Sequence, residues 1–261
     1  MTLLSLALST LLAAPAAADA ESGWEKNETP HFVIRHQRMG FSPGDHTRIE
    51  QIYSALHPDL WRLVPWMADR KTDVFLYEDH AHYLAGRFHP PAWSGGLLTT
   101  QDGEPALAVF EPLDTSIVAH ELTHLYFHSY FGEVQPPSWL NEGLAGMLQG
   151  EALALPDSRE KGPVLAAVAP LAAFFESRPG RDMPSAWVSS WYRQAHSVVR
   201  FLKRGHIEMK FADFCALLKE GAQVEDALKK VYEYDDLAAF EAAWHKWRPK
   251  KAMGLPSGLG D

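Results

Sequence analysis

Two histidines four residues apart are the feature that most limits what this chain can fold into. His120 and His124 lie in residues 118–125, which read VAHELTHL. On a helix, residues at this spacing share a face about one turn apart, so both imidazoles can reach one ion. Neutral imidazole is a favoured zinc ligand. Glu121 lies one step round such a helix, where it can reach a water on the metal without binding the metal itself.

A downstream segment supplies a third candidate ligand. A catalytic zinc takes three protein ligands and keeps one position open. Glu142 lies in residues 139–145, WLNEGLA, early in the next predicted helix, and 17 residues separate it from His124. The connection between the two predicted helices is short and contains Gly and Pro, so the helices can run antiparallel. The sequence therefore predicts one Zn²⁺ per chain, held by His120, His124 and Glu142.

The pair of motifs HELTH and WLNEG resembles the metal site of the gluzincins. Within that group it is similar to the bacterial peptidase-MA-like domains. The likeness is close over the two central helices and looser over the strand-rich half before them. It implies a zinc-dependent peptidase that acts on a peptide or protein, with Glu142 as third ligand and Glu121 as general base. A metal-activated water would attack the peptide bond.

Two departures limit what this resemblance carries over. The metzincins need a Gly and a third His soon after His124, and Phe127 and Tyr130 occupy those positions here. The gluzincin aminopeptidases grip the free amine of their substrate with a Gly-Ala-Met-Glu-Asn segment, of which this chain has no copy. The choice between endopeptidase and exopeptidase therefore stays open.

A second catalytic group is expected to stabilise the developing oxyanion. Tyr192 lies in residues 191–198, WYRQAHSV, which resemble the helix that follows the metal site in peptidase-MA-like domains. His196, one helical turn further on, is the alternative donor. His128 continues the spacing of the two ligand histidines, but each turn advances about 5.4 Å, so a place behind the ligands or at the surface is expected.

The remaining histidines and the cysteine are expected to have neither a catalytic nor a metal-binding role. His80, His82 and His89 form a looser group that reads as polar loop residues rather than as an accessory metal site. Cys215 is the only cysteine, so no internal disulfide can form. Its amphipathic surroundings indicate a small buried hydrophobe rather than a catalytic thiol.

The pattern of elements predicts an α+β fold, and the resemblance implies that it is of the zincin type. A small mixed sheet with helices, in residues 21–131, precedes a mainly helical half, 132–261, with the active-site cleft between them in one catalytic domain. By the same resemblance, the edge strand of the sheet is expected to pair with extended substrate, and residues 106–110 are taken as that edge. Strands are predicted at 31–35, 73–77, 96–100 and 106–110, and helices at 49–64, 116–131, 138–150, 191–204, 211–220 and 238–247.

The first twenty residues read as a cleaved signal peptide. Residues 3–14 are almost wholly apolar, and Ala18-Asp19-Ala20 fits the small-x-small pattern of a cut after Ala20. The apolar run is shorter than the roughly 20 residues that a spanning helix needs, and no later stretch is long enough. A secreted or periplasmic protein with no membrane span after cleavage is therefore expected. The net charge of −9 argues against a nucleic-acid partner.

Two other functions fit the same residues. One is a zinc-binding interaction protein that keeps the zincin scaffold without turnover, although an intact Glu121 has no use in such a protein. The other is a zinc amidase that acts on cell-wall peptides, which the sequence does not separate from a peptidase. The oligomeric state is not predicted.

Overall fold

The computed structural model describes residues 24–37, 43–92, 94–152, 169–180 and 183–247. The predicted signal peptide, with its cut after Ala20, lies outside these residues, and so does the end of the chain beyond residue 247. Within the described part, no helix combines the length and the apolar character needed to cross a membrane.

A mixed five-stranded sheet forms the first half of the molecule. Its spatial order is β1-β2-β3-β5-β4, in which β2 and β5 both run parallel to β3, while β1 and β4 run antiparallel to their neighbours. The strands β4 and β5 are joined by a turn at Asp102 and Gly103, both with positive φ, as in tight hairpins. The strands are β1 (Glu25–Glu28), β2 (Phe32–His36), β3 (Thr72–Tyr77), β4 (Leu97–Gln101) and β5 (Glu104–Phe110).

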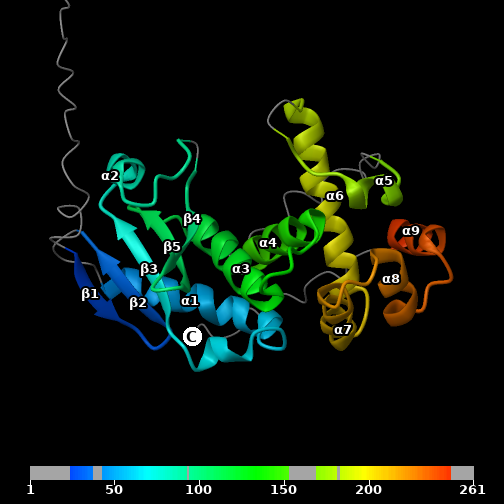
Figure 1. Ribbon diagram of the computed structural model, residues 1–261, viewed down its shortest axis with the longest axis horizontal. Coiled ribbons are helices and arrows are strands. Elements are labelled where there is room, and N and C mark those ends of the chain that lie inside the picture. The colour runs from blue at the N-terminus through cyan, green and yellow to red at the C-terminus, as the bar shows by residue number, and fades with distance from the viewer. Residues whose placement is uncertain (1–23, 38–42, 93, 153–168, 181–182, 248–261) are drawn as a thin grey trace, which may run out of the picture.

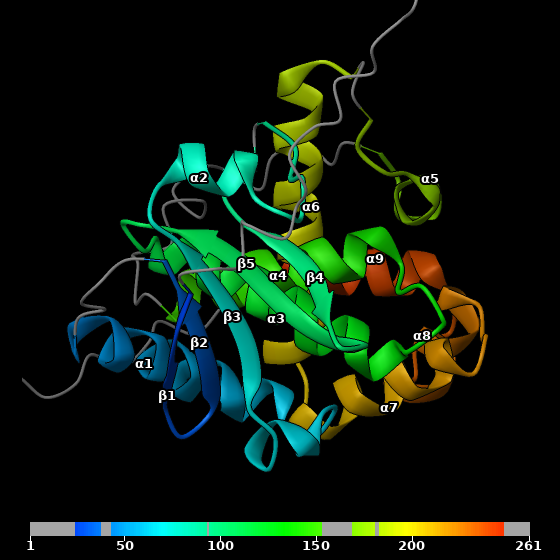
Figure 2. The same cartoon turned by 60° about the vertical axis from the view of Figure 1, so that its left-hand side comes forward.

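The order of the strands corrects one expectation. β5 lies between β3 and β4, where Ala108 faces Phe75 on one side and Leu97 on the other. The prediction that residues 106–110 form the edge was wrong, because the hairpin returns β5 to the inside of the sheet. Ala106 to Val109 are accordingly buried. β4 is the outer strand on this side of the sheet (Figure 2).

Alternate residues of each strand pack into two different layers, as the period of two along a strand requires. One face of the sheet is covered by α1 (Pro43–Leu60) and α3 (Thr115–Phe131), and from it Val74 and Leu76 enter the main core. The opposite face carries a smaller cluster, in which Phe75 and Tyr77 pack with Tyr83 of α2 (His80–Ala85).

The second half is helical and lies beyond α3 (Figure 1). Its helices share one hydrophobic core with the sheet. This main core extends from Phe32 of β2 to Trp244 of α9. α6 begins six residues earlier than predicted, because its first turns bury no apolar stripe that a sequence pattern could reveal. The helices are α4 (Ser138–Ala152), α5 (Leu171–Glu176), α6 (Ser185–Arg204), α7 (Glu208–Lys219), α8 (Val224–Tyr232) and α9 (Leu237–Lys246), and a 3₁₀ turn, η2 (Pro65–Ala68), follows α1.

The structure is thus an α+β fold with a mixed sheet first and helices after it, as predicted. The helices α3 and α4 lie between the sheet and α6, so the segments that carry the two sequence motifs are central in the molecule (Figure 1). The short elements β1, α2, α5 and α8 were not predicted. For α2 and α5 the reason is their length, since each spans only six residues and shows no clear period.

Candidate metal centre

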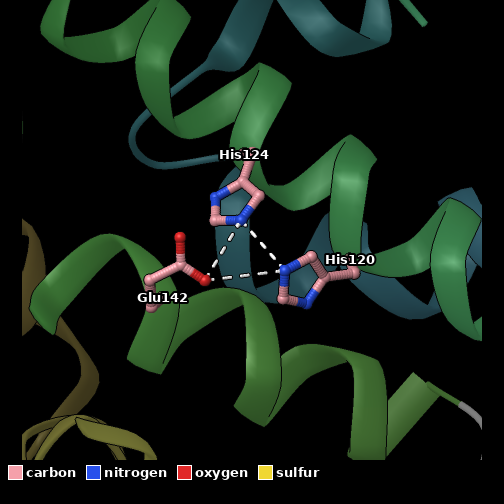
Figure 3. A group of neighbouring side chains, drawn as sticks. All are labelled: His120, His124 and Glu142. Atoms are coloured by element: carbon pink, nitrogen blue, oxygen red, sulfur yellow. Dashed lines mark hydrogen bonds and ion pairs between the residues drawn. The ribbon is translucent and has the colours of Figure 1, made fainter. Parts of the chain in front are cut away.

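The helix α3 carries two of the candidate ligands on one face. It begins after Asp114, whose Oδ1 accepts hydrogen bonds from the backbone N–H groups of Ser116 and Ile117 at 2.8 and 3.3 Å. This is the usual way in which a helix satisfies its first free N–H groups. His120 and His124 follow on successive turns, and Figure 3 shows both rings turned toward α4.

Three donor atoms converge between α3 and α4 (Figure 3). The Nε2 atoms of His120 and His124 lie 3.0 Å apart, and Glu142 Oε2 lies 3.7 Å from each. Ligand bonds of about 2.0–2.1 Å in a tetrahedral zinc site place the donors about 3.3 Å from one another. The spacing of these atoms therefore suits a single zinc ion. Among the described residues, this is the only group of three or more side chains that could hold a metal.

The centre is not fully enclosed. The side chain of His124 is 9 % exposed, whereas those of His120 and Glu142 are each 24 % exposed. Two of the three candidate ligands are thus within reach of solvent. That arrangement fits a catalytic zinc, which keeps a position for water or substrate, better than a closed structural site.

Two carboxamides of α4 face the outer nitrogens of the histidines. His120 Nδ1 lies 3.1 Å from Gln149 Oε1, and His124 Nδ1 lies 2.9 Å from Asn141 Oδ1. An amide oxygen only accepts, so this arrangement suits imidazoles that carry their proton on Nδ1 and keep the lone pair of Nε2 for a metal. The sequence analysis missed both amides. Their positions beside Glu142 and seven residues after it, two turns along the same helix, were the available signal.

Both amides are themselves held by α3. Gln149 Nε2 donates to Ser116 Oγ, and Asn141 Nδ2 lies 3.2 Å from His128 Nε2. His128 therefore lies behind His124, as expected, and is not one of the three converging donors. Burial, together with the charge of His124, lowers the pKa of His128, which favours its neutral form.

Two carboxyl groups of the site have opposite pKa shifts. Burial raises the pKa of Glu121, and the negative charge of Glu142 raises it further. The charge of His124 acts in the opposite direction but does not cancel the rise. Burial also acts to raise the pKa of Glu142, but the hydrogen bond and charge of His124 outweigh it, so this pKa is lowered. The same contact with Glu142 raises the pKa of His124 although burial opposes the rise.

The carbon chain of Glu121 is pressed against the backbone that leads into β4. A Cβ atom at Gly96 would lie 2.9 Å from Glu121 Cγ and 3.0 Å from Ile117 Cγ2. A side chain of any size at Gly96 would therefore displace its neighbours. Ser94 holds this turn, since its hydroxyl donates to the carbonyl of Gly96 and lies 2.9 Å from the hydroxyl of Tyr83.

A second glycine brings α6 close to the ligand helix. A Cβ atom at Gly143 would lie 2.5 Å from the carbonyl oxygen of Ala195 and 2.6 Å from Val199 Cγ2. Only glycine allows α4 and α6 to approach this closely. The glycine of the WLNEG segment thus sets the distance between Glu142 and α6.

Tyr192 and His196 both lie on α6. Tyr192 is 37 % exposed, and burial of its ring together with the charge of Glu142 raises the pKa of its phenol to about 12. The phenol consequently keeps its proton at neutral pH. His196 is only 8 % exposed. Of the two, Tyr192 has the greater access to solvent.

The other reactive side chains have local roles in the described structure. His82 Nδ1 lies 2.9 Å from Asp79 Oδ1 at the start of α2, and the ring of His80 packs against Phe110. Neither belongs to a metal-binding group of the described residues. Cys215 is fully buried, and burial raises its thiol pKa well above the usual range, so it is no activated nucleophile.

Comparison with models of protein families gives a match that includes the metal centre. A family model described as the peptidase MA superfamily matches residues 63–249, a span that includes α3, α4 and α6. No curated protein matches the chain. The matched span covers most of the sequence and all the candidate site residues.

Proposed function

Since the chain belongs to the peptidase MA superfamily, we propose that it is a zinc-dependent peptidase of the gluzincin type. The observation that carries the proposal is the convergence of three donor atoms, all within 4.8 Å of one another, from side chains that are not all buried. In this proposal His120, His124 and Glu142 bind the zinc, and the amides of α4 keep both imidazoles in the metal-binding tautomer. The zinc would polarise the scissile carbonyl and make the attacking water more acidic.

Glu121 is the proposed general base. It lies next to His120 on α3 but outside the group of donors, so its carboxylate is available to take a proton from the attacking water. Its raised pKa makes it a better base than an ordinary surface carboxylate, and it can then pass the proton to the leaving amine. Contact with Gly96 restricts the stem of Glu121 and so limits where its carboxylate can point.

Tyr192 is the proposed donor to the oxyanion that develops on the carbonyl. Its phenol is protonated at neutral pH, which a donor requires, and the charge of Glu142 acts on it. Such donors act most strongly where charge develops in the transition state.

An extended segment of substrate is proposed to pair with β4. Among the described residues this strand has β5 on one side and no strand on the other, so its outer edge can add a peptide strand. The turn before β4 touches Glu121, which brings the start of this edge next to the metal centre. Main-chain pairing of this kind gives affinity with little choice of sequence. Export to the periplasm or the exterior, after cleavage behind Ala20, completes the proposal.

The Glu121→Gln variant tests the function. Without a carboxylate to accept the proton, hydrolysis of a generic protein substrate should fall by roughly 10²–10⁴-fold. The zinc content should remain that of the wild type, because Glu121 is not a ligand. His124→Ala is the matched control, and it should lose both zinc and activity. Hydrolysis that survives in Glu121→Gln would dismiss the proposed mechanism.

A further inference from the structure

A chain of three side chains runs behind the metal centre. His124 Nδ1 lies 2.9 Å from Asn141 Oδ1, and Asn141 Nδ2 lies 3.2 Å from His128 Nε2. The two histidines are one turn apart on α3, and the asparagine comes from α4. One amide group therefore bridges two imidazoles, only one of which is a candidate ligand. His128 itself belongs to neither of the two sequence motifs.

The places of the protons follow from what each atom can do. The oxygen of an amide only accepts a hydrogen bond, and its nitrogen only donates. With the oxygen toward His124, that ring must carry its proton on Nδ1, and with the nitrogen toward His128, Nε2 of His128 must accept. If Asn141 were reversed, His124 would need its proton on Nε2. That proton would face His120 and Glu142, where it would exclude a metal.

We propose that His128 is a positioning residue that holds Asn141 in one orientation and through it fixes the metal-binding tautomer of His124. The amide could otherwise turn over at little cost, because its oxygen and nitrogen are alike in size. With its own proton on Nδ1, His128 supplies an acceptor at Nε2, and this acceptor favours the observed orientation of the amide. The inference rests on the proposed zinc site, but it concerns the affinity for metal and not the hydrolysis of substrate.

The test compares zinc affinities of purified protein, measured by competition with a chromophoric chelator. The wild type is compared with His128→Phe, which keeps a ring but removes the acceptor, and with His128→Gln, whose amide oxygen reaches about as far as Nε2. Loss of one hydrogen bond should raise the Kd of His128→Phe for zinc by roughly 2- to 12-fold. His128→Gln should bind zinc like the wild type. His245→Phe, which removes a histidine of α9, is the matched control and should change nothing.

A second background separates positioning from packing. In Asn141→Asp the carboxylate can only accept, so it fixes the proton of His124 on Nδ1 without help from His128. Adding His128→Phe to Asn141→Asp should therefore leave the zinc Kd unchanged. An equal loss of affinity in both backgrounds would mean that the ring of His128 acts by packing, and would overturn the inference.

The remaining outcomes also decide the matter. Equal zinc affinity of His128→Phe and wild type would overturn the inference, as would a His128→Gln variant that binds zinc as weakly as His128→Phe. A wild type that binds zinc without hydrolysing any peptide would refute the proposed peptidase and leave this inference standing. A wild type that binds no zinc would refute both. Thermal unfolding of the metal-free variants checks that each one is folded.

Discussion

At the scale of single residues, the site contains two carboxyl groups that their surroundings make different. Glu142 faces two imidazoles and has a lowered pKa, whereas Glu121 is buried against Gly96 and has a raised one. When environments separate the pKa values of two neighbouring acids in this way, one is suited to stay charged and the other to exchange a proton. This difference supports the proposed assignment of Glu142 to the metal and of Glu121 to the water.

The role of Tyr192 is tested by Tyr192→Phe. Loss of the phenol should lower kcat by roughly 10²-fold, as expected for one donor to an oxyanion, and should leave the zinc content unchanged. Because the pKa of Tyr192 is raised to about 12, its phenol stays protonated through the neutral and mildly alkaline range. The ratio of wild-type to variant kcat should therefore be constant between about pH 7 and 10.

His196→Gln is the comparison for this prediction, since His196 was the alternative donor on the same helix. If His196→Gln lowers kcat more than Tyr192→Phe does, while zinc is retained, the oxyanion donor is His196. A Tyr192→Phe variant with wild-type kcat would remove Tyr192 from the mechanism.

The residues of the site were predictable to different degrees. His120, Glu121 and His124 follow from a local helical spacing, and Glu142 follows from a short connection between helices. Asn141 and Gln149 were missed: their spacing from Glu142 along α4 places them on a related face, but which histidine each one contacts depends on how α3 packs against α4. The same holds for the contact between Gly96 and Glu121, which joins residues far apart in the sequence.

At the scale of elements, the turn before β4 should control the position of Glu121, the proposed general base. Gly96→Ala would place a methyl group 2.9 Å from Glu121 Cγ, so the side chain of Glu121 must move. A displacement of about 1 Å can cost roughly 10²-fold in rate, so we expect kcat to fall markedly with zinc content unchanged. Steady-state kinetics and metal analysis on the same preparation measure both quantities.

Gly150→Ala is the control for this substitution. A Cβ atom at Gly150 of α4 meets no atom within 4 Å, so an added methyl group there has room. Gly150→Ala should therefore keep wild-type kinetics. A Gly96→Ala variant as active as Gly150→Ala would show that the contact with Glu121 does not limit catalysis.

Helices and strands were predicted where their apolar residues recur with a clear helical or strand period, or where Gly and Pro mark an end. α3 and α4 begin and end within two residues of the prediction, because the Gly and Pro residues of the short connection mark where one helix ends and the next begins. The position of β5 inside the sheet was not predictable from its own residues. A hairpin can add to a sheet by either strand, and only the long-range pairing with β3 decides which strand becomes the edge.

At the scale of the whole molecule, an ion cluster joins the end of α1 to the end of α6. Asp59 accepts hydrogen bonds from both Nη atoms of Arg204 at 2.8 and 2.7 Å, and Lys203 Nζ lies 3.0 Å from its Oδ1. The side chain of Lys203 is 2 % exposed. This cluster ties the layer that covers the sheet to the helix that carries Tyr192.

Asp59→Asn should destabilise the fold, because it leaves the buried charge of Lys203 without its carboxylate. Breaking such a pair costs about 3 kcal/mol in the free energy of unfolding, measured by urea titration. The pKa of Asp59 is lowered in the folded protein, since Arg204 and Lys203 outweigh the opposing effect of burial. Its contribution is therefore complete above the unfolded pKa of about 3.9 and is lost as the pH falls through the lower, folded value.

The difference between wild type and Asp59→Asn should accordingly be constant from about pH 5 to 7 and shrink below about pH 4. Glu208→Gln is the matched control. Glu208 pairs with Arg62 at 3.7 Å between side chains that are 50 % and 39 % exposed, so its loss should cost less than about 1 kcal/mol. Equal unfolding free energies of Asp59→Asn and Glu208→Gln at neutral pH would contradict the structural role of the cluster.

The account as a whole depends on one zinc ion bound by side chains from α3 and α4. The most direct measurement is the zinc content of purified wild type and of Glu142→Gln after dialysis against the same weak chelator. We predict about one equivalent per chain in the wild type and far less in Glu142→Gln, because that variant loses the charged third ligand. Equal zinc content in the two proteins, or none in the wild type, would contradict the account.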